Sequence, residues 1–270
     1  MSTRKRFGQH FLEPAWVRKL VEVVQPQPGD AFLEIGAGRG ALTLALAARV
    51  QSLVAIEIDR DLVADLERVV PANVQVVAAD FLETDIRALL STSTAPFRVA
   101  GNLPYNISSP ILFRLLSLAD AGRLLFDATL MLQREVADRL AARPGTADYG
   151  VLSVLVQLHA TVTRPLVLPP GAFRPPPRVR SAVVHLVFGP PPVPIADAAL
   201  LERMVRSMFT QRRKTIGNAL RDFADAHGCG SGEAAAKTGI DAGRRPETLT
   251  LEEIARLAGV FASGSRPDVL

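Results

Sequence analysis

The tetrapeptide Asn102-Leu103-Pro104-Tyr105 combines groups that could hold an exocyclic amine of a nucleobase. Adenine N6 is a poor nucleophile because its lone pair is delocalised into the ring, so a catalyst must hold the amine with hydrogen-bond acceptors. The Asn102 side-chain oxygen and the Leu103 carbonyl are such acceptors, and Pro104 restricts Leu103 to extended conformations that can aim its carbonyl. Tyr105 offers a ring face for an unstacked base. The same four residues could also form an ordinary turn between a strand and a helix.

Strand and helix signals before this tetrapeptide favour the first interpretation. The apolar run 31–35 predicts a strand, the glycine-rich loop 36–40 follows it, and residues 41–50 have the Leu and Ala spacing of a helix. Glycines let the backbone approach a ligand closely, and the helix N-terminus presents free N–H groups to an anion. Further strands are predicted at 53–58, 74–79, 97–100, 129–132, 152–158 and 182–188. The pattern predicts an α/β fold with a Rossmann-like sheet of about seven strands.

Glycine or polar residues stand where each of the first four strands ends. They are Gly36, Gly38 and Gly40, then Glu57 with Ile58, then Asp80 with Phe81, and finally Asn102. Ligands of open α/β sheets bind at the carboxyl ends of the strands, so we expect these residues to share one crevice. Glu57 can accept hydrogen bonds from ribose hydroxyls and Asp80 from an adenine amine, which predicts an S-adenosylmethionine site.

Simpler interpretations exist for each of these residues taken alone. The glycine loop with Glu57 also fits a nicotinamide dinucleotide site. Asp80 could be a helix N-cap, and Glu57 could be a solvated carboxylate. An NAD-dependent enzyme, however, has no particular use for Asp80 or for the tetrapeptide at the ends of the third and fourth strands.

With these residues in place, the sequence resembles the small-subunit ribosomal RNA adenine N6,N6-dimethyltransferases, the family whose loss gives kasugamycin resistance in bacteria. The likeness extends through nearly the whole chain. His10 stands where many relatives carry Asn, and Ser109 where Thr is frequent. The similar segments are 6–12, 34–40, 57, 80–81, 102–108, 133–137, 173–181, 209–216 and 245–249.

The resemblance implies roles for residues that spacing alone does not single out. Gln9, His10 and Leu12 would line the methionine side of the cofactor, and Glu34 would belong to the cofactor motif with the glycine loop. Phe173 would stack on the target base opposite Tyr105. The implied reaction is methylation of N6 on two adjacent adenosines in a loop near the 3′ end of 16S rRNA, during maturation of the small ribosomal subunit.

Length and composition are compatible with a catalytic domain and an accessory domain. The chain has 270 residues, of which 48% are hydrophobic, so it can bury a large core. The proline-rich run 190–194 cannot continue a helix or a central strand and marks a boundary. We expect a catalytic domain at 1–189 and an all-α domain for RNA or ribosome binding at 195–270, in a monomer. Helical periodicity in the second domain lies at 197–209, 211–226 and 251–261.

Basic residues are concentrated at the N-terminus and in the C-terminal part. The net charge of +4 and the pI near 9.7 are compatible with a polyanionic partner. Phosphate contacts of this kind give affinity and position but little sequence discrimination, and any single arginine could equally belong to a solvated helix face. The predicted RNA contacts are Arg4, Lys5, Arg6, Arg206, Arg212, Arg213, Lys214 and Arg221.

The sequence does not favour a disulfide-rich, metal-binding, secreted or membrane-spanning protein. The single Cys229 excludes an intramolecular disulfide framework, and the four histidines show no metal-ligand spacing, so no metal is expected. Neither a signal peptide nor an apolar run of membrane-spanning length is present in the sequence, which predicts a cytoplasmic protein without a membrane partner.

Three alternative functions remain open. The first is a large-subunit rRNA adenine N6-methyltransferase of the macrolide-resistance type, against which only the segment 212–216 argues by resemblance. The second is a ribosome-assembly factor whose binding matters more than its catalysis. The third is an NAD-dependent oxidoreductase.

Overall fold

The computed structural model describes residues 10–91, 95–119 and 122–264. Gln9 and the basic residues Arg4, Lys5 and Arg6 lie outside these ranges. The chain forms two compact units, one of residues 1–137 and 160–190 and the other of residues 138–159 and 191–270. The sequence placed 138–159 in the catalytic domain, whereas the structure groups this segment with the C-terminal helices.

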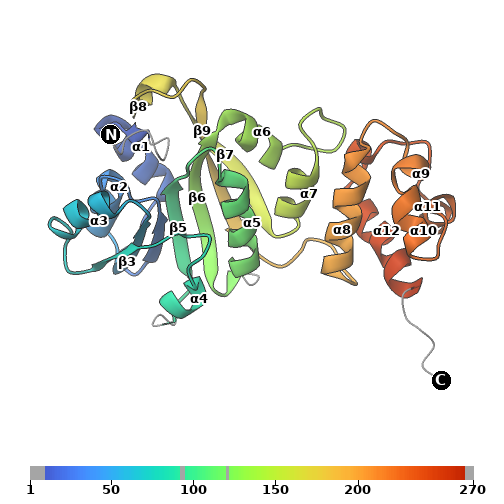
Figure 1. Cartoon of the computed structure of the whole chain (residues 1–270), viewed down its shortest axis with the longest axis horizontal. Coiled ribbons are helices and arrows are strands. Elements are labelled where there is room, and N and C mark those ends of the chain that lie inside the picture. The colour runs from blue at the N-terminus through green and yellow to red at the C-terminus, as the bar shows by residue number, and fades with distance from the viewer. Residues whose placement is uncertain (1–9, 92–94, 120–121, 265–270) are drawn as a thin grey trace. The chain divides into compact units, whose positions relative to one another are not determined.

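The first unit is built on a seven-stranded sheet with the strand order β4-β3-β2-β5-β6-β9-β7 (Figure 1). The strands from β4 to β6 run parallel, whereas β9 is antiparallel to both β6 and β7. The prediction of a Rossmann-like α/β sheet is therefore confirmed. The strands are β2 (Ala31–Ile35), β3 (Ser52–Glu57), β4 (Val74–Ala78), β5 (Phe97–Asn102), β6 (Leu125–Gln133), β7 (Ala160–Leu168) and β9 (Ser181–Phe188).

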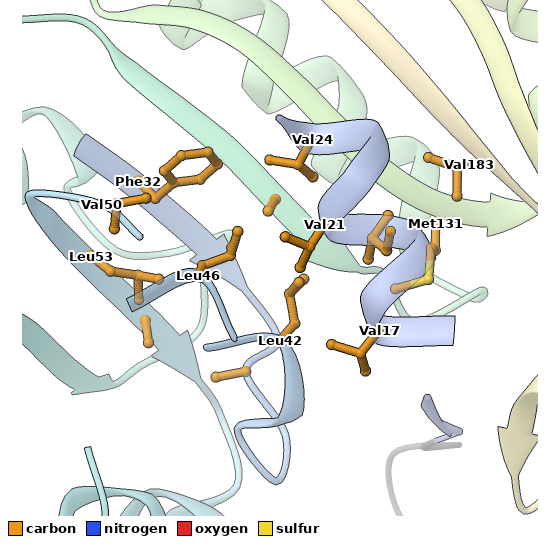
Figure 2. Packing of buried hydrophobic residues seen from close by; sticks show 14 of the residues in the cluster. Val17, Val21, Val24, Phe32, Leu42, Leu46, Val50, Leu53, Met131 and Val183 are labelled. Carbon is orange, nitrogen blue, oxygen red and sulfur yellow. The ribbon is translucent and has the colours of Figure 1, made fainter. Parts of the chain in front are cut away.

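Helices cover the sheet, with α1 and α2 on one side and α5 on the other (Figure 1). Val17, Val21 and Val24 of α1 lie on one helix face and pack with Leu42 and Leu46 of α2 in a buried cluster (Figure 2). This packing fixes the helix that follows the glycine loop. The helices of this unit are α1 (Pro14–Val24), α2 (Ala41–Ala47), α3 (Arg60–Glu67), α4 (Ile86–Leu89) and α5 (Ser108–Ala119), and α6 (Arg134–Leu140) begins in it.

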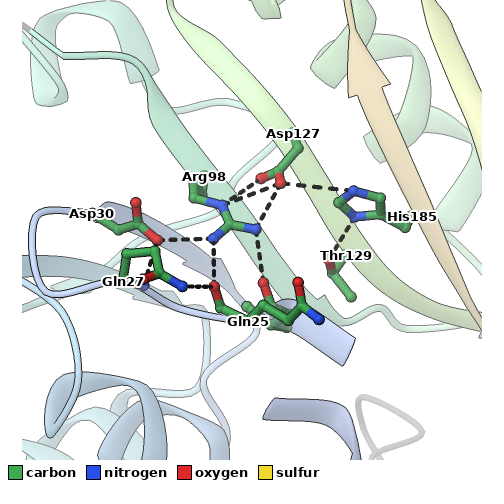
Figure 3. A network of polar contacts seen from close by, with 8 residues as sticks. Gln25, Gln27, Asp30, Arg98, Asp127, Thr129 and His185 are labelled. Carbon is green, nitrogen blue, oxygen red and sulfur yellow. Dashed lines mark hydrogen bonds and ion pairs between the residues drawn. The ribbon is translucent and has the colours of Figure 1, made fainter. Parts of the chain in front are cut away.

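A buried ion network ties the strands together at their amino ends (Figure 3). All five N–H groups of the Arg98 guanidinium have acceptors: both carboxylate oxygens of Asp127, one oxygen of Asp30, and the carbonyls of Val24 and Gln25. The shortest N···O distances are 2.7 Å to Asp127 and 2.8 Å to Asp30. The network therefore joins the end of α1 to β5 and β6.

A short two-stranded ladder holds the first described residues. Strand β1 (Phe11–Leu12) pairs antiparallel with β8 (Phe173–Arg174), after the 3-10 turn η3 (Pro170–Ala172). The Glu13 N–H donates to the Ala172 carbonyl at 2.9 Å, and the Glu13 carboxylate pairs with Arg174 at 3.0 Å. The segment 10–13 is thus fixed against 172–175.

Every element described within 138–159 and 191–264 is helical. Met204, Met208 and Phe261 are among its fully buried side chains. The prediction of a strand at 152–158 is wrong, because this segment forms α7 and the strand follows it as β7. Residues 153–156 are all buried, and an apolar run buried on every side cannot be assigned to strand or helix by its periodicity. The helices are α7 (Val151–Gln157), α8 (Ala198–Thr210), α9 (Ile216–Ala219), α10 (Arg221–Ala226), α11 (Ser231–Thr238), η4 (Pro246–Thr248) and α12 (Leu251–Gly264).

The described residues contain neither a membrane-spanning helix nor a cluster of metal ligands. None of their helices is both long and apolar enough to cross a membrane. Nor do three or more of their His, Cys, Asp or Glu side chains group as they would around a metal ion.

Candidate active site

A pocket lies at the carboxyl ends of the parallel strands and gathers the residues that end them. Its wall combines the glycine loop, the ends of β3, β4 and β5, and the segment at His10. Leu12, Glu34, Gly40 and Phe173 are not part of the wall. The predicted residues that line it are His10, Gly36, Gly38, Glu57, Ile58, Asp80, Phe81, Asn102, Leu103, Pro104 and Tyr105.

The glycine loop has a left-handed backbone at three positions. Gly36, Gly38 and Gly40 have φ angles of 75°, 59° and 78°, which favour glycine. A Cβ at Gly40 would lie 2.3 Å from the Leu66 side chain, so Gly40 serves packing against α3. Gly36 and Gly38 line the pocket, where their backbone can come close to a ligand.

Glu57 is buried at the end of β3 and accepts three backbone hydrogen bonds. Its Oε2 accepts from the Gly38 N–H at 2.8 Å, and its Oε1 accepts from Ile58 and Asp59 at 2.9 Å each. The side chain is not a solvated carboxylate, because Glu57 is only 5% exposed. Each carboxylate oxygen can accept two hydrogen bonds, so Oε2 retains capacity for a ligand hydroxyl.

Asp80 both shapes the loop after β4 and lines the pocket. Its Oδ1 accepts from the Leu82 N–H at 2.8 Å, which closes a turn on the chain itself. The Arg114 guanidinium of α5 donates to the Leu82 and Thr84 carbonyls in the same loop. Sequence reasoning did not identify Arg114, whose partners lie about 30 residues away and leave no local signal.

The amide of Asn102 has a fixed orientation. Its Nδ2 donates to the His10 carbonyl at 2.7 Å, and because a carbonyl can only accept, the nitrogen must occupy that position. The Asn102 side-chain oxygen therefore points away from His10. The Leu103 N–H donates to the Met131 carbonyl of β6 at 3.2 Å, which holds the backbone next to Asn102.

Tyr105 is held by a hydrogen bond at its hydroxyl, and its ring stacks on the His10 ring. The hydroxyl shares a hydrogen bond of 2.6 Å with the Ser181 Oγ. Burial raises the pKa of Tyr105, which the bond to Ser181 partly opposes, so the phenol is neutral at physiological pH. Ser181 was in a segment of resemblance, but its support of Tyr105 became visible only in the structure.

Comparisons with known proteins decide between the enzyme classes. The family described as ribosomal RNA adenine dimethylase matches residues 1–263 of this chain. The chain belongs to the ribosomal RNA adenine dimethylase family. This confirms the resemblance found in the sequence.

Relatives match the chain over nearly its whole length. A protein of Alcanivorax borkumensis named ribosomal RNA small subunit methyltransferase A is 45% identical over 98% of this chain and 91% of its own length. A protein of the same name from Chromobacterium violaceum is 46% identical over 94% of both chains.

Solved structures share the fold of this rRNA adenine dimethylase family member. A dimethyladenosine transferase from Plasmodium falciparum has a TM-score of 0.76 at 23% identity and covers 94% of this chain and 98% of its own. The 23S rRNA methyltransferase ErmE has a TM-score of 0.64 at 26% identity, with 92% and 98% covered.

Phe173 of this family member, predicted to lie on the target base, does not line the pocket. Its side chain is fully buried and belongs to the same apolar cluster as Val17 and Leu20 of α1. Its backbone pairs with Leu12 in the ladder of β8 and β1. That Phe173 stacks on the base opposite Tyr105 stays a prediction.

Glu34 is buried below the glycine loop and does not reach the pocket. It is 2% exposed, and its Oε2 has no hydrogen-bond partner among the described residues. Burial raises the pKa of Glu34 to about 8, an effect that the Thr43 hydroxyl opposes and the Glu57 charge reinforces. The side chain is thus mostly protonated at neutral pH and does not contact a ligand in this pocket directly.

The predicted RNA-contacting side chains of the helical unit fall into two groups. Arg212 is paired, because its guanidinium donates to Glu247 at 2.8 Å and to the Ala147 carbonyl at 2.9 Å. Arg206 pairs with Glu202 at 2.7 Å, and Arg221 donates to Asn218. By contrast, Arg213 and Lys214 are exposed on the turn before α9.

Proposed function

We propose that this protein transfers methyl groups from S-adenosylmethionine to N6 of two adjacent adenosines near the 3′ end of small-subunit rRNA, giving N6,N6-dimethyladenosine. The observation that carries the proposal is the fixed Asn102 amide, whose oxygen is available at the end of a pocket that also contains Glu57 and Gly38. Membership of the family and the names of the relatives from A. borkumensis and C. violaceum support it.

The pocket residues fit S-adenosylmethionine. Glu57 would accept from the ribose hydroxyls through Oε2, and the exposed apolar side chain of Ile58 would lie against the adenine. Asp80, whose Oδ1 already caps the loop, would accept from the adenine amine through its other oxygen. Gly36 and Gly38 leave room for the chain to approach the methionine part. When bound, this cofactor supplies a methyl group on a positively charged sulfur that is a good leaving group.

The residues of this chain would contribute positioning and polarisation. The Asn102 oxygen and the Leu103 carbonyl would accept from the two N–H groups of N6, which localises the nitrogen lone pair. Tyr105 would stack on the base and hold it in line for transfer. The proton can leave to water once the nitrogen has become cationic, so no side chain is required as a general base. After the first transfer, the monomethylated amine would enter again with one N–H.

Target selection would come from the helical unit. The pocket can recognise adenine, but one base edge carries no information about its location in the rRNA. The exposed Arg213 and Lys214 would contact phosphates of a folded region of the small subunit and leave a loop adenosine for the pocket. We propose that the protein acts as a monomer on this particle. Such a substrate would place it in the cytoplasm.

The experiment must also test the alternative that the protein methylates large-subunit rRNA. ErmE, a 23S rRNA methyltransferase, shares the fold over most of both chains at 26% identity. Purified small and large subunits from a strain lacking this protein should therefore be incubated separately with tritiated S-adenosylmethionine. We expect label in small subunits alone, at up to two methyl groups on each of two adenosines. Label in large subunits, or in neither particle, would overturn the proposal.

A separate test addresses the assembly-factor alternative. A catalytically inactive variant should be supplied to a strain that lacks the protein. If the variant restores growth and small-subunit maturation fully, binding is the selected function and methylation is incidental to it.

A further inference from the structure

The turn after β4 is closed by hydrogen bonds to Asp80, the residue proposed to bind the adenine amine of the cofactor. The Asp80 carbonyl accepts from the Glu83 and Thr84 N–H groups at 3.1 and 3.0 Å and from the Thr84 hydroxyl at 2.6 Å. The Asp80 Oδ1 accepts from the Leu82 N–H at 2.8 Å. Because these bonds use the donors of the turn, its carbonyls at Leu82 and Thr84 need donors from outside it.

Arg114 of α5 supplies those donors. Its two terminal nitrogens donate to the Leu82 and Thr84 carbonyls, one to each. The guanidinium also lies over the Phe81 ring, with its central carbon 5.7 Å from the ring centroid. A planar guanidinium presents its N–H groups in a fixed fork, so one side chain sets the positions of both carbonyls. The turn that begins at Asp80 is therefore attached to α5.

The helix that holds this turn also forms part of the pocket wall. Ile111 of α5 lines the pocket together with Asp80 and Phe81. Ile111 and Arg114 are three residues apart, so they lie on the same side of the helix. One face of α5 thus forms one part of the wall and fixes another.

Arg114 is paired less completely than an arginine that only joins structural elements. All N–H groups of Arg98 have acceptors, whereas the buried Nε of Arg114 has no hydrogen-bond partner among the described residues. An unpaired buried donor lowers stability, and proteins tolerate such losses mainly at functional sites. This difference favours a role of Arg114 in binding over a role in stability alone.

We propose that Arg114 is a positioning residue for the cofactor, because it holds the turn in the orientation in which the second Asp80 carboxylate oxygen accepts from the adenine amine. This inference rests on the proposed function. Without Arg114, the turn would exchange its two bonds to α5 for bonds to water, and the need to order it again would oppose cofactor binding. Arg114 thus acts on cofactor affinity through Asp80, without a contact of its own with the cofactor.

Two substitutions and one control test this role. Arg114→Met keeps an apolar stem without a donor, and Arg114→Lys keeps one charged donor group on a flexible stem. We expect Arg114→Met to raise the Kd and KM for S-adenosylmethionine by about tenfold, as loss of an orienting partner does at metal sites, and Arg114→Lys to raise them less. The kcat for small subunits at saturating cofactor should stay within about threefold of wild type. Arg87→Met is the control and should leave the Kd near wild type, because Arg87 of α4 donates to the Ser117 carbonyl of α5 at 3.3 Å and does not line the pocket.

A pair of ligands separates positioning of Asp80 from a general loss of structure. Calorimetry should compare S-adenosylhomocysteine with its analogue that lacks the 6-amino group of adenine. The wild type should bind S-adenosylhomocysteine at least about tenfold more tightly, since Asp80 accepts a hydrogen bond from that group. Arg114→Met should weaken binding of the amine-bearing ligand by about tenfold and of the analogue by less than about threefold. In an Asp80→Ala background, Arg114→Met should add less than about twofold, because its effect passes through Asp80.

Each other outcome contradicts the proposal. Equal weakening of the two ligands would show that Arg114 maintains the pocket in general, and unchanged Kd values would leave it with no task in cofactor binding. A lower kcat with an unchanged Kd would place its effect on the target base. If Arg114→Met does not unfold cooperatively on heating, the preference of Arg114→Lys for the amine-bearing ligand decides in its place, and it should fall below that of the wild type.

Failure of the proposed function is distinct from failure of this inference. In that case the wild-type protein would leave small subunits unmethylated, whereas the comparison of the Arg114 variants by calorimetry needs only the protein and the two cofactor analogues.

Discussion

The two ends of the same sheet contain polar clusters of opposite character. At the amino ends, every N–H of Arg98 has an acceptor, and Asp127 is 2% exposed. At the carboxyl ends, the Glu57 Oε2 accepts one hydrogen bond, from the Gly38 N–H, and Asn102 is bound through its nitrogen. Fully paired buried charges hold strands together, whereas groups with remaining hydrogen-bonding capacity can recognise a ligand. The cluster at the amino ends therefore serves stability, and the cluster at the carboxyl ends serves function.

The largest expected effect is on stability, at the amino ends. Arg98→Ala leaves Asp127 buried without its main partner, so the free energy of unfolding should fall by about 3–5 kcal/mol, as for other broken buried pairs. Denaturant titration measures this change. Arg68→Ala is the matched control, because its pair with Asp65 is exposed and should contribute less than about 1 kcal/mol. A lower kcat for folded Arg98→Ala would contradict the claim that the cluster at the amino ends affects stability alone.

The next effect is on catalysis, at the carboxyl ends. Asn102→Ala should lower kcat for methyl transfer by about 10² or more while cofactor affinity survives, because it removes an oriented acceptor of the transition state. Asn73→Ala is the converse control, since Asn73 donates to the Ala47 and Val50 carbonyls outside the pocket and should affect stability alone. Unchanged turnover in Asn102→Ala would remove this residue from the mechanism.

A third effect is the pH dependence of the free energy of unfolding, which Glu34 should cause. Its pKa of about 8 in the folded protein exceeds the ordinary 4.5, so the folded state binds a proton that the unfolded chain has lost between these values. The contribution of Glu34 to stability is full below pH 4.5 and is lost as the pH rises towards 8. Relative to Glu34→Gln, the wild type should lose roughly 2 kcal/mol between pH 5.5 and 7.5. Parallel pH profiles of unfolding for the two proteins would show that Glu34 is charged when folded.

A smaller effect concerns cofactor affinity. Glu57→Gln keeps the shape of the side chain but loses its charge, so the Kd for S-adenosylmethionine should rise by about tenfold while rRNA affinity is unchanged. Asp59→Asn is the control, because Asp59 caps α3 through the Asp61 N–H and does not line the pocket. Calorimetry distinguishes the two, and a normal Kd for Glu57→Gln would argue against its contact with the ribose.

The smallest effect extends the same distinction to the helical unit. Lys214→Ala should raise KM for small subunits several-fold and reduce the slope of log K against log salt by about 1, as for loss of one phosphate contact. Arg212→Ala should instead lower the melting temperature with little change in slope, because Arg212 joins Glu247 to the loop at Ala147. Equal slopes for Lys214→Ala and wild type would place RNA binding elsewhere.

Sequence reasoning succeeded where function depends on residues adjacent in the chain. Asn102 to Tyr105 form one tetrapeptide, and the glycine loop, Glu57 and Asp80 end successive parallel strands, so topology alone brings them together. It failed where a role depends on distant partners. The pairing of Arg212 with Glu247 and the contacts of Arg114 with the loop after Asp80 leave no local pattern. The helix at 151–157 was missed because burial on all sides removes the periodic signal.

The most direct test of the central claim is to map methylated adenosines in rRNA by mass spectrometry. The rRNA should come from a strain that lacks this protein, after the strain has been supplied with either the wild-type protein or Asn102→Ala. We predict that the wild type restores N6,N6-dimethyladenosine at two adjacent positions of small-subunit rRNA and that Asn102→Ala restores neither. Modification of large-subunit rRNA by the wild type, or equal modification by both proteins, would contradict the account.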